Sequence, residues 1–389
     1  MAKNIHKDRA GAYQKQPTDY LAFIPRSLPP TPPLRIDPEM LLLLSEADRA
    51  LGRLDGAADT LPNPDLFVFM YVRKEAVLSS QIEGTQASLM DVLEFEADAA
   101  KPGNPQDVEE VVNYIGAMNY GLARLKELPL SLRLIREIHA SLMQGVRGGN
   151  KDPGEFRRSQ NWVGPAGSNL KRAIYVPPPP VQMLEALNNL EIFLHGGDPM
   201  PVLIKAGLAH SQFETIHPFL DGNGRMGRLL ITFLLCQSTV LKRPLLYLSF
   251  YFKQHRKEYY DRLQSVREYG DWEGWLKFFL RGVTQVSEEA TQTSRHIVSL
   301  REQHRELIRV RTRKGASTAL ALLEKLYFRP VVSVQRITEL TGLTYANANN
   351  LAKDFVNIGL LKETTGAKRN RSFAYKPYLD LFKDVTPTV

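Results

Sequence analysis

The sequence predicts a mainly α-helical protein that contains a short β-hairpin and ends in a small module of helices and strands. Apolar residues recur with the 3.6-residue period of amphipathic helices through most of the chain. The clearest β-like run in the centre lies inside a glycine- and proline-rich stretch at 145–180. After residue 316, short helical patterns alternate with strand-like pieces, which indicates a separate C-terminal fold.

The composition is that of a globular protein larger than one ordinary core. Of 389 residues, 43% are hydrophobic and 24% charged, so we expect two or three domains. Apolar runs such as Leu229–Cys236 are too short to cross a bilayer, and Met1–Lys15 is polar and basic, so we expect a cytoplasmic protein. The single cysteine, Cys236, excludes an intramolecular disulfide and a cysteine-based zinc site. The net charge of +8 fits a nucleic-acid surface, a nucleotide pocket or a solvated basic face.

The stretch up to Pro33 is rich in proline and polar residues and predicts an extended arm that leads into the first helix. Helical periodicity follows in a series of segments, the second of which ends next to Gly84, a favourable residue at a helix C-terminus. The expected helices are 38–54, 65–82, 107–126, 131–144, 181–194, 202–215, 225–237, 254–266 and 272–310. The last is a long charged connector, for which a break near Gly282 is an open alternative.

The stretch 145–180 interrupts this pattern. Glycine, proline and asparagine dominate it, and its β-like run, Ala173-Ile174-Tyr175-Val176, precedes four prolines. Because structureless loops of this length are uncommon in compact domains, we expect a functional loop that contains a short hairpin.

The C-terminal segment predicts a winged helix-turn-helix. Helical patterns at 317–327, 333–341 and 344–358 precede strand-like pieces that end at 373–375, and a basic run with Lys368, Arg369 and Arg371 lies between the strands. We therefore expect three parts: an N-terminal helical region at 1–128, a core and connector helix at 129–312, and the winged helix at 313–389.

The most informative segment is 217–228, which reads HPFLDGNGRMGR. Gly222 and Gly224 flank an asparagine immediately before an apolar helical run, so backbone N–H groups can meet a phosphate at a helix N-terminus. Arg225 and Arg228 are three residues apart and can hold further phosphate oxygens.

Two more residues of this segment suit nucleotide chemistry. Asp221 offers a carboxylate of the kind that binds Mg²⁺, and His217 can take a proton near neutral pH. Each residue alone has a structural interpretation, because a histidine before proline is usually structural and an Asp-Gly-Asn-Gly string is usually a turn. Their conjunction within twelve residues favours an active site.

The segment resembles the signature of the Fic family, His-x-Phe-x-(Asp/Glu)-Gly-Asn-Gly-Arg-x-x-Arg, with every position filled. The preceding Phe213–Ile216 and the run Ile174–Pro177 also resemble the family, and the resemblance extends from about residue 38 to 300. It implies a Fic-type helical core and a protein adenylyltransferase. Such an enzyme transfers AMP from Mg·ATP to a serine, threonine or tyrosine hydroxyl of a target protein or of itself.

The resemblance also implies a role for each matching residue. His217 would be the general base, Asp221 would hold Mg²⁺, and Phe219 would anchor the loop in the core. The run Ala173, Ile174, Tyr175 and Val176 would be a flap that aligns a target segment by strand addition. The residues implied in ATP or phosphate binding are Gly222, Asn223, Gly224, Arg225, Gly227 and Arg228. Tyr260 resembles a tyrosine that contacts the adenine, although simple packing explains it equally well.

A second motif predicts a built-in inhibitor. Ser79-Ser80-Gln81-Ile82-Glu83-Gly84 resembles the Ser/Thr-x-x-x-Glu-Gly motif that some Fic proteins carry before the catalytic core. Ser79 and Glu83 are four residues apart and share one helix face. We expect Glu83 to pair with Arg228 and to place negative charge where the γ-phosphate of ATP belongs.

Alternatives stay open. Within the enzyme class, the core could remove AMP or use another phosphate donor. In a different class, the chain is a DNA-binding regulator whose Fic core senses nucleotide, with Asn347, Asn349, Asn350 and Lys353 on the second helix facing a groove. For the C-terminal module we favour dimerisation or target docking over DNA.

Overall fold

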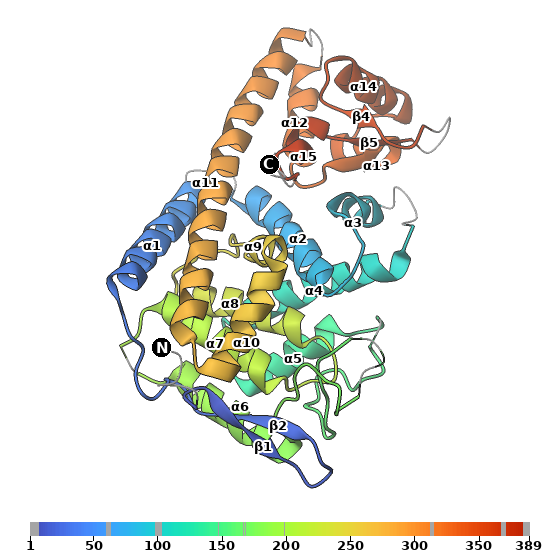
Figure 1. The fold of residues 1–389 in the computed structure, drawn as a ribbon. Coiled ribbons are helices and arrows are strands. Elements are labelled where there is room, and N and C mark those ends of the chain that lie inside the picture. The colour runs from blue at the N-terminus through green and yellow to red at the C-terminus, as the bar shows by residue number, and fades with distance from the viewer. Residues whose placement is uncertain are drawn as a thin grey trace.

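The computed structural model describes residues 8–59, 64–97, 103–146, 148–165, 167, 169–197, 199–311, 315–366 and 371–383. Figure 1 shows a body of helices with a two-stranded hairpin at one end and the C-terminal module at the other. Within these described residues, no helix is both long and apolar enough to cross a membrane.

The N-terminal arm contains a β-hairpin, which the sequence did not predict. Strands β1 (Gly11–Lys15) and β2 (Leu21–Pro25) pair in antiparallel register, with Gly11 opposite Pro25. Phe23 is fully buried, and its amide donates to the Val176 carbonyl at 2.9 Å. The hairpin is therefore fixed by tertiary contacts, which the proline-rich composition does not reveal.

The helical predictions are confirmed with small shifts at their ends. The predicted helices are observed as α1 (Pro38–Asp59), α2 (Asp65–Ile82), α4 (Pro105–Arg124), α5 (Leu132–Leu142), α6 (Pro180–His195), α7 (Val202–Ile216), α8 (Asn223–Gln237), α10 (Arg256–Tyr269) and α11 (Trp272–Arg311). Among the residues that the structure describes, three short helices were not predicted: α3 (Leu89–Glu96), α9 (Ser249–Gln254) and α15 (Lys376–Asp380). Helix α3 begins at a capping box in which Ser88 and Asp91 satisfy each other's backbone amides.

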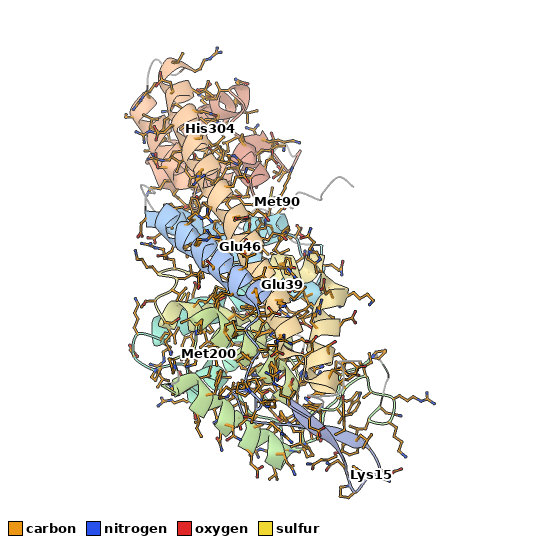
Figure 2. The ribbon with its side chains drawn as sticks, turned by 60° about the vertical axis from the view of Figure 1, so that its left-hand side comes forward. Lys15, Glu39, Glu46, Met90, Met200 and His304 are labelled. Carbon is orange, nitrogen blue, oxygen red and sulfur yellow. The ribbon has the colours of Figure 1, made fainter. Side chains whose placement is uncertain are left out.

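Helix α11 runs unbroken through Gly282. A Cβ at Gly282 would lie 2.6 Å from Cδ1 of Tyr251, so this glycine marks a close packing contact rather than a break. Helix α1 packs along α11 over much of its length, as Figures 1 and 2 show from two sides.

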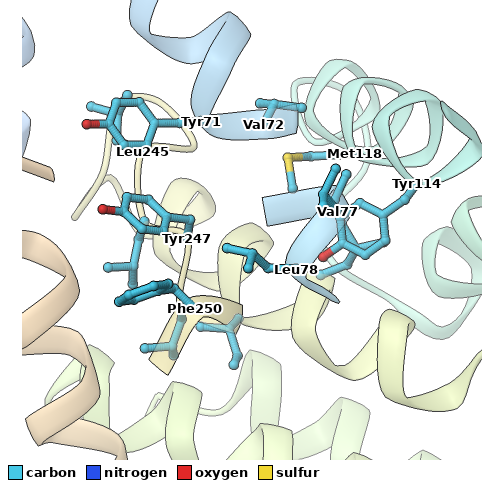
Figure 3. Close-up of a cluster of buried hydrophobic side chains, with 14 of the residues drawn as sticks. Tyr71, Val72, Val77, Leu78, Tyr114, Met118, Leu245, Tyr247 and Phe250 are labelled. Atoms are coloured by element: carbon cyan, nitrogen blue, oxygen red, sulfur yellow. The ribbon is translucent and has the colours of Figure 1, made fainter. Parts of the chain in front are cut away.

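Helix α2 lies inside the body, between α4 and α9. Figure 3 shows part of its buried surroundings, where Tyr71 of α2 stacks on Tyr247 with ring centroids 5.1 Å apart. Val77 and Leu78 continue the buried face toward the C-terminal end of the helix. A helix held in this way presents its last turn to the neighbouring α8 at a defined position.

The C-terminal module combines helices with a small antiparallel sheet in the order β3-β5-β4. Its elements are α12 (Ala316–Leu326), β3 (Val331–Ser333), α13 (Val334–Thr341), α14 (Tyr345–Asn357), β4 (Lys362–Glu363), β5 (Ser372–Ala374) and α15 (Lys376–Asp380). The winged-helix assignment stays a prediction. Lys368 and Arg369 lie outside the described residues.

The module rests on the helical body near α2. The ring of Phe382 packs edge-on against Tyr71, with centroids 5.7 Å apart. Beside this contact, a cavity of about 570 Å³ opens between α2, α3 and the module, with Val77, Leu93 and Leu379 among its apolar walls.

Candidate active site

The signature loop joins α7 to α8, two helices that pack side by side in the body. Helix α7 ends at His217, whose φ of 50° is left-handed, and Pro218 follows it, so the helix cannot continue. Gly222 precedes α8 with a φ of 75°, a conformation that suits glycine. The loop thus places the His217 side chain and the N-terminus of α8 in one region.

His217 is oriented through its backbone. Its carbonyl accepts hydrogen bonds from Arg157 Nε at 3.0 Å and Asn161 Nδ2 at 3.3 Å, and its ring bonds to the Glu214 backbone. Burial, together with the positive charges of Arg157 and Arg267, lowers the pKa of His217 to about 4. The imidazole is therefore neutral at physiological pH and ready to accept a proton.

The Asn223 side chain closes the loop. Its Oδ1 accepts from the Phe219 amide at 2.8 Å, and its Nδ2 donates to the Phe219 carbonyl at 2.8 Å. Both atoms of the amide therefore hold the loop, and since Nδ2 carries a second N–H, the phosphate contact that the resemblance implies for Asn223 stays a prediction. Phe219 is fully buried, in agreement with an anchoring position.

A histidine that sequence analysis did not single out supports the same loop. The His139 ring stacks on Phe219 at a centroid distance of 3.6 Å. Its Nδ1 accepts from the Gly154 amide at 2.9 Å, so Nε2 carries the proton and donates to the Asp221 carbonyl at 3.0 Å. Burial lowers the pKa of His139 to about 4, which keeps this tautomer neutral.

Asp221 has the properties of a carboxylate that can take a metal cation. Partial burial alone would raise its pKa, but Lys151, whose Nζ lies 2.9 Å from Oδ2, holds the pKa below the ordinary value. The carboxylate is about one-third exposed and therefore reachable. Among the described residues, no cluster of three or more histidine, cysteine, aspartate or glutamate side chains forms a protein-only metal cage. This donor set fits Mg²⁺, which commonly binds one or two carboxylates together with phosphate oxygens.

Arg228 is buried and held by the end of α2. Its Nε donates to Ser79 Oγ at 2.8 Å, and its Nη2 donates to the Ser79 carbonyl at 3.0 Å and to Glu83 Oε1 at 2.7 Å. The contact between Glu83 and Arg228 is the one that the sequence motif predicted. A Cβ at Gly224 would lie 2.2 Å from Glu83 Oε1, so the absence of a side chain there lets the carboxylate reach the start of α8.

Two further carboxyl groups lie in the buried surroundings of Arg228. Burial raises the pKa of Glu214 to about 7, against the opposing effect of Arg228. Burial also raises the pKa of Glu75 to about 7, although Ser249 donates to it from both its amide and its hydroxyl. Glu83 is the acid of this group that directly bonds the guanidinium and has an exposed side chain, at 38%.

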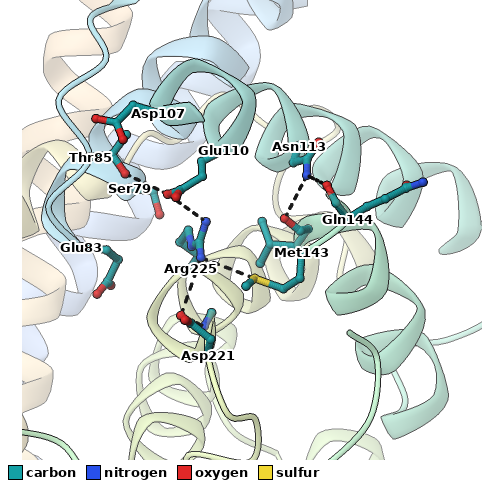
Figure 4. Close-up of polar contacts among 12 residues, drawn as sticks. Ser79, Glu83, Thr85, Asp107, Glu110, Asn113, Met143, Gln144, Asp221 and Arg225 are labelled. Carbon is teal, nitrogen blue, oxygen red and sulfur yellow. Dashed lines mark hydrogen bonds and ion pairs between the residues drawn. The ribbon is translucent and has the colours of Figure 1, made fainter. Parts of the chain in front are cut away.

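Arg225 occupies a different environment on the same helix (Figure 4). Its guanidinium is buried and lies 3.5 Å from Glu110 Oε2 on α4 and 3.9 Å from Asp221 Oδ1. Its remaining close contact is Met143 Sδ at 3.4 Å, a weak acceptor.

The other predicted ligands divide between the site and the core. Gly227 serves packing, since its carbonyl accepts from His210 and a Cβ there would meet Glu214 Oε1 at 2.4 Å. The neighbouring Tyr259 is buried, with its hydroxyl 2.9 Å from His210 Nε2. Tyr260 is 43% exposed, and its ring packs against that of Tyr259 with centroids 5.1 Å apart.

The run Ala173–Val176 forms a single β-bridge, between Tyr175 and Val163, rather than a complete hairpin. Tyr175 points inward: it is buried, and its hydroxyl donates to the Thr215 carbonyl at 2.5 Å. Ile174 points outward and is 66% exposed. The alternation leaves Ile174 as the side chain of this run that is available to another molecule.

Sequence analysis missed several residues that build the site: Arg157, Asn161, His139, Lys151 and Glu110. Each comes from a segment distant from the signature, and three of them contact backbone atoms, which leave no trace in residue spacing. The five were indistinguishable from ordinary surface or core positions before the fold was known.

Two family models match the chain. Residues 41–123 match the family model described as Fic/DOC family N-terminal, and residues 129–235 match the Fic/DOC family model. The chain is 35% identical over 207 residues to the Protein adenylyltransferase Fic of Aedes aegypti, and this match covers 51% of this chain and 37% of that protein. It is 31% identical over 268 residues to the protein of the same name from Drosophila virilis, with coverages of 65% and 48%. The chain thus spans less than half the length of these two relatives.

Solved structures show the same fold. A Fic family protein from Desulfovibrio desulfuricans G20 superposes with a TM-score of 0.58 at 20% identity, over 88% of this chain and 97% of that chain. A Fic domain containing signaling protein from Bacteroides thetaiotaomicron gives 0.51 at 16% identity, over 64% and 95%. The predicted resemblance to the Fic family is confirmed by the matches to the two Fic/DOC family models and by the named relatives.

Proposed function

We propose that this chain of the Fic/DOC family is a protein adenylyltransferase that transfers AMP from Mg·ATP to a serine, threonine or tyrosine hydroxyl of a protein, itself included. The observation that carries the proposal is the contact of Glu83 with Arg228 beside a complete signature loop. A neutral His217, a reachable Asp221 and the N-terminus of α8 provide the base, the cation ligand and the anion cradle in one place.

The chemistry follows from these positions. His217 accepts the proton of the target hydroxyl as its oxygen bonds to the α-phosphorus, and the bond from that phosphorus to the bridging oxygen breaks, so that pyrophosphate leaves. Arg225 and the first amides of α8 stabilise negative charge on the phosphates. Asp221 would hold Mg²⁺, which supplies further charge neutralisation when bound. The exposed ring of Tyr260 is the candidate contact for the adenine.

Glu83 acts as a brake in this proposal. Its carboxylate occupies the guanidinium that would bind the γ-phosphate, and its negative charge repels that phosphate. ATP then binds with its phosphates displaced from the line of attack, which slows transfer through loss of positioning. Because the Glu83 side chain is 38% exposed, displacing it does not require unfolding of α2.

The proposal is tested by labelling with ATP that carries ³²P at the α-phosphate. Wild type is compared with Glu83→Gly, Glu83→Ala and the double variant Glu83→Gly with His217→Ala. We expect protein-bound label to rise in both single variants and to vanish in the double variant. The alanine variant serves as a control, because a rise restricted to glycine would reflect backbone freedom rather than loss of charge.

Two results would contradict the proposal. If the single variants transfer AMP no faster than wild type at saturating Mg²⁺ and ATP, Glu83 does not inhibit the enzyme. A chain that binds ATP and incorporates no label in any variant favours another phosphate donor, AMP removal or nucleotide sensing.

For partners, the exposed Ile174 is the proposed contact of the target segment, joined by strand addition along residues 173–174. For the C-terminal module we propose contact with protein, either a second copy or the target, in preference to DNA. The preference rests on Arg371 of the predicted wing, whose guanidinium is already engaged within the module. It lies 3.4 Å from Glu363, and its Nη2 donates to Asn349 at 2.5 Å. A salt-dependent complex of the full chain with duplex DNA would reverse this preference. The requirement for ATP leads us to propose the cytoplasm as its compartment.

A further inference from the structure

Arg225 is a buried cation whose hydrogen-bonding capacity is largely unused. Only 4% of the residue is exposed, and its Nε and Nη1 have no hydrogen-bond partner among the described residues. Nη2 meets the sulfur of Met143, which is a weak acceptor. Two buried, unsatisfied donors beside a signature loop indicate a position prepared for an anion.

Glu110 of α4 is the acid nearest to this guanidinium. Its Oε2 lies 3.5 Å from Arg225 Nη1, close enough for attraction but without a hydrogen bond. Both side chains are about 95% buried, so the interaction is only weakly screened by water. Glu110 therefore partly neutralises the arginine and competes with any anion that approaches it.

The same Glu110 oxygen has a second partner. Thr85 Oγ1 donates to Glu110 Oε2 at 3.1 Å, and Thr85 is itself buried, two residues beyond Glu83. Figure 4 shows Thr85 and Arg225 reaching this carboxylate from different sides. Thr85 and Arg225 thus share one oxygen, and the bond from the threonine hydroxyl fixes the carboxylate where it forms an ion pair but no hydrogen bond with the arginine.

A parallel contact fixes the threonine in place. The amide of Gln86 donates to Asp107 Oδ2 at 2.7 Å, so the segment that follows Glu83 is tied to the first turns of α4. Helix α4 therefore contacts both the segment that follows Glu83, through Thr85 and Gln86, and Arg225 of the anion site.

We propose that Glu110 is a positioning residue that sets the affinity of Arg225 for the second phosphate of the nucleotide, and that Thr85 tunes it by sharing the carboxylate oxygen. This inference rests on the proposed nucleotide site. It assigns a second acidic restraint, which acts on Arg225 from α4 and is separate from the contact of Glu83 with Arg228. The restraint should distinguish nucleotides by their number of phosphates. A nucleoside diphosphate has a second phosphate for Arg225 to bind, whereas a monophosphate does not.

The test measures binding rather than catalysis. The full chain is titrated calorimetrically with ADP and with AMP in the presence of a chelator, using wild type, Glu110→Gln, Thr85→Val and the double variant. Glu110→Gln should tighten ADP binding about five- to tenfold, equivalent to about 1.0–1.4 kcal/mol. AMP binding should stay within about twofold, because its phosphate lies outside the reach of Arg225 in this scheme.

Thr85→Val should act in the opposite direction. With the hydroxyl gone, the carboxylate closes on Arg225, so ADP binding weakens by about three- to fivefold while AMP binding is retained. In the double variant, Thr85→Val should no longer weaken ADP binding. The amide that replaces the Glu110 carboxylate is neutral, so its position relative to Arg225 matters little. Glu109→Gln, an exposed change on the same helix, is the matched control and should alter neither affinity.

Opposite signs separate this proposal from simple destabilisation, which would weaken binding in every variant. Unchanged or weaker ADP binding in Glu110→Gln with AMP binding intact overturns it. If Glu110→Gln fails to fold, Thr85→Val decides alone, and ADP binding that does not weaken there also overturns it. ADP binding that behaves as predicted in a chain that transfers no AMP would contradict only the proposed function, whereas a wild type that binds neither nucleotide contradicts both.

Discussion

The signature loop has two sides that are built from different kinds of contact. On one side, Asn223, His139 and Arg157 bond to backbone atoms of the loop, and no ligand has to displace them. On the other side, ion pairs hold Arg228 and Asp221, and a bound nucleotide and cation would have to replace both pairs.

The difference shows how one short loop combines rigidity with exchange. Backbone hydrogen bonds to buried side chains fix the position of the loop, because breaking one leaves an unsatisfied polar group. Ion pairs with partly exposed acids preserve the charges of the site while leaving them available. Changes on the fixed side should therefore lower stability and activity together, whereas changes on the exchangeable side should alter activity more than stability.

The largest effect is expected on the fixed side. Asn223→Ala removes two hydrogen bonds and leaves the buried amide of Phe219 unsatisfied, while the Phe219 carbonyl keeps Asn161 Nδ2 at 2.9 Å, so the free energy of unfolding should fall by about 1–3 kcal/mol. Urea unfolding followed by circular dichroism measures it, and Asn350→Ala, an exposed change on α14, should shift the value by less than about 0.5 kcal/mol. A loss below about 1 kcal/mol for Asn223→Ala would mean that the loop is not held by this side chain.

On the exchangeable side, Glu83→Gln should give the reverse pattern. Removing the charge frees Arg228 for phosphate, and the initial rate of AMP transfer should rise about tenfold or more. The free energy of unfolding should fall by less than about 2 kcal/mol, because Glu83 is partly exposed and Glu214 still lies near the guanidinium. Rates from α-labelled ATP and urea midpoints from the same preparations check both parts. A large loss of stability without a gain in rate would mean that the contact of Glu83 with Arg228 holds the structure together and does not inhibit transfer.

A smaller effect is expected at the cation ligand. Lys151→Met removes the ammonium that competes for Asp221, so the Mg²⁺ concentration that gives half-maximal transfer should fall about twofold. The measurement is best made in a Glu83→Gly background, with Lys171→Met as the exposed control in the same loop. A higher Mg²⁺ requirement would show that Lys151 helps to bind the nucleotide instead.

The smallest effect is expected from pH. A base with a pKa of about 4 is unprotonated throughout the neutral range, and activity is lost only as pH falls through that value. Between pH 8 and pH 5 the rate of the Glu83→Gly variant should change by only about a tenth, whereas a histidine with the ordinary pKa of about 6.5 would lose most of its activity. A midpoint near 6.5 would place His217 in a more open environment than the structure shows.

Much of the fold could be predicted from the sequence, because amphipathic helices such as α4 and α5 show the 3.6-residue period of apolar residues directly. The pairing of Glu83 with Arg228 was also predicted, since two separate motifs contained both partners. The break considered near Gly282 did not occur, because this glycine accommodates Tyr251. The hairpin at the N-terminus was missed, since its stability comes from the burial of Phe23 rather than from local turn residues.

The interior of the site was less predictable. Motif residues indicated which groups lie in the loop, but not where each side chain points. Asn223 turned out to bind the loop, and Tyr175 turned out to point into the core. The supporting residues His139 and Glu110 lie on α5 and α4, and only the packing of these helices brings them to the loop.

Helix α11 gives the molecule a mechanical property. Its 40 residues make a rod about 60 Å long that starts in the helical body and ends beside the C-terminal module, with no break along its length (Figure 1). The module at the far end of α11 also contacts α2, where Phe382 packs against Tyr71. Tyr71 lies roughly 18 Å along α2 from Glu83. A load that tilts the module is therefore transmitted to α2, the helix whose C-terminal end leads into Glu83.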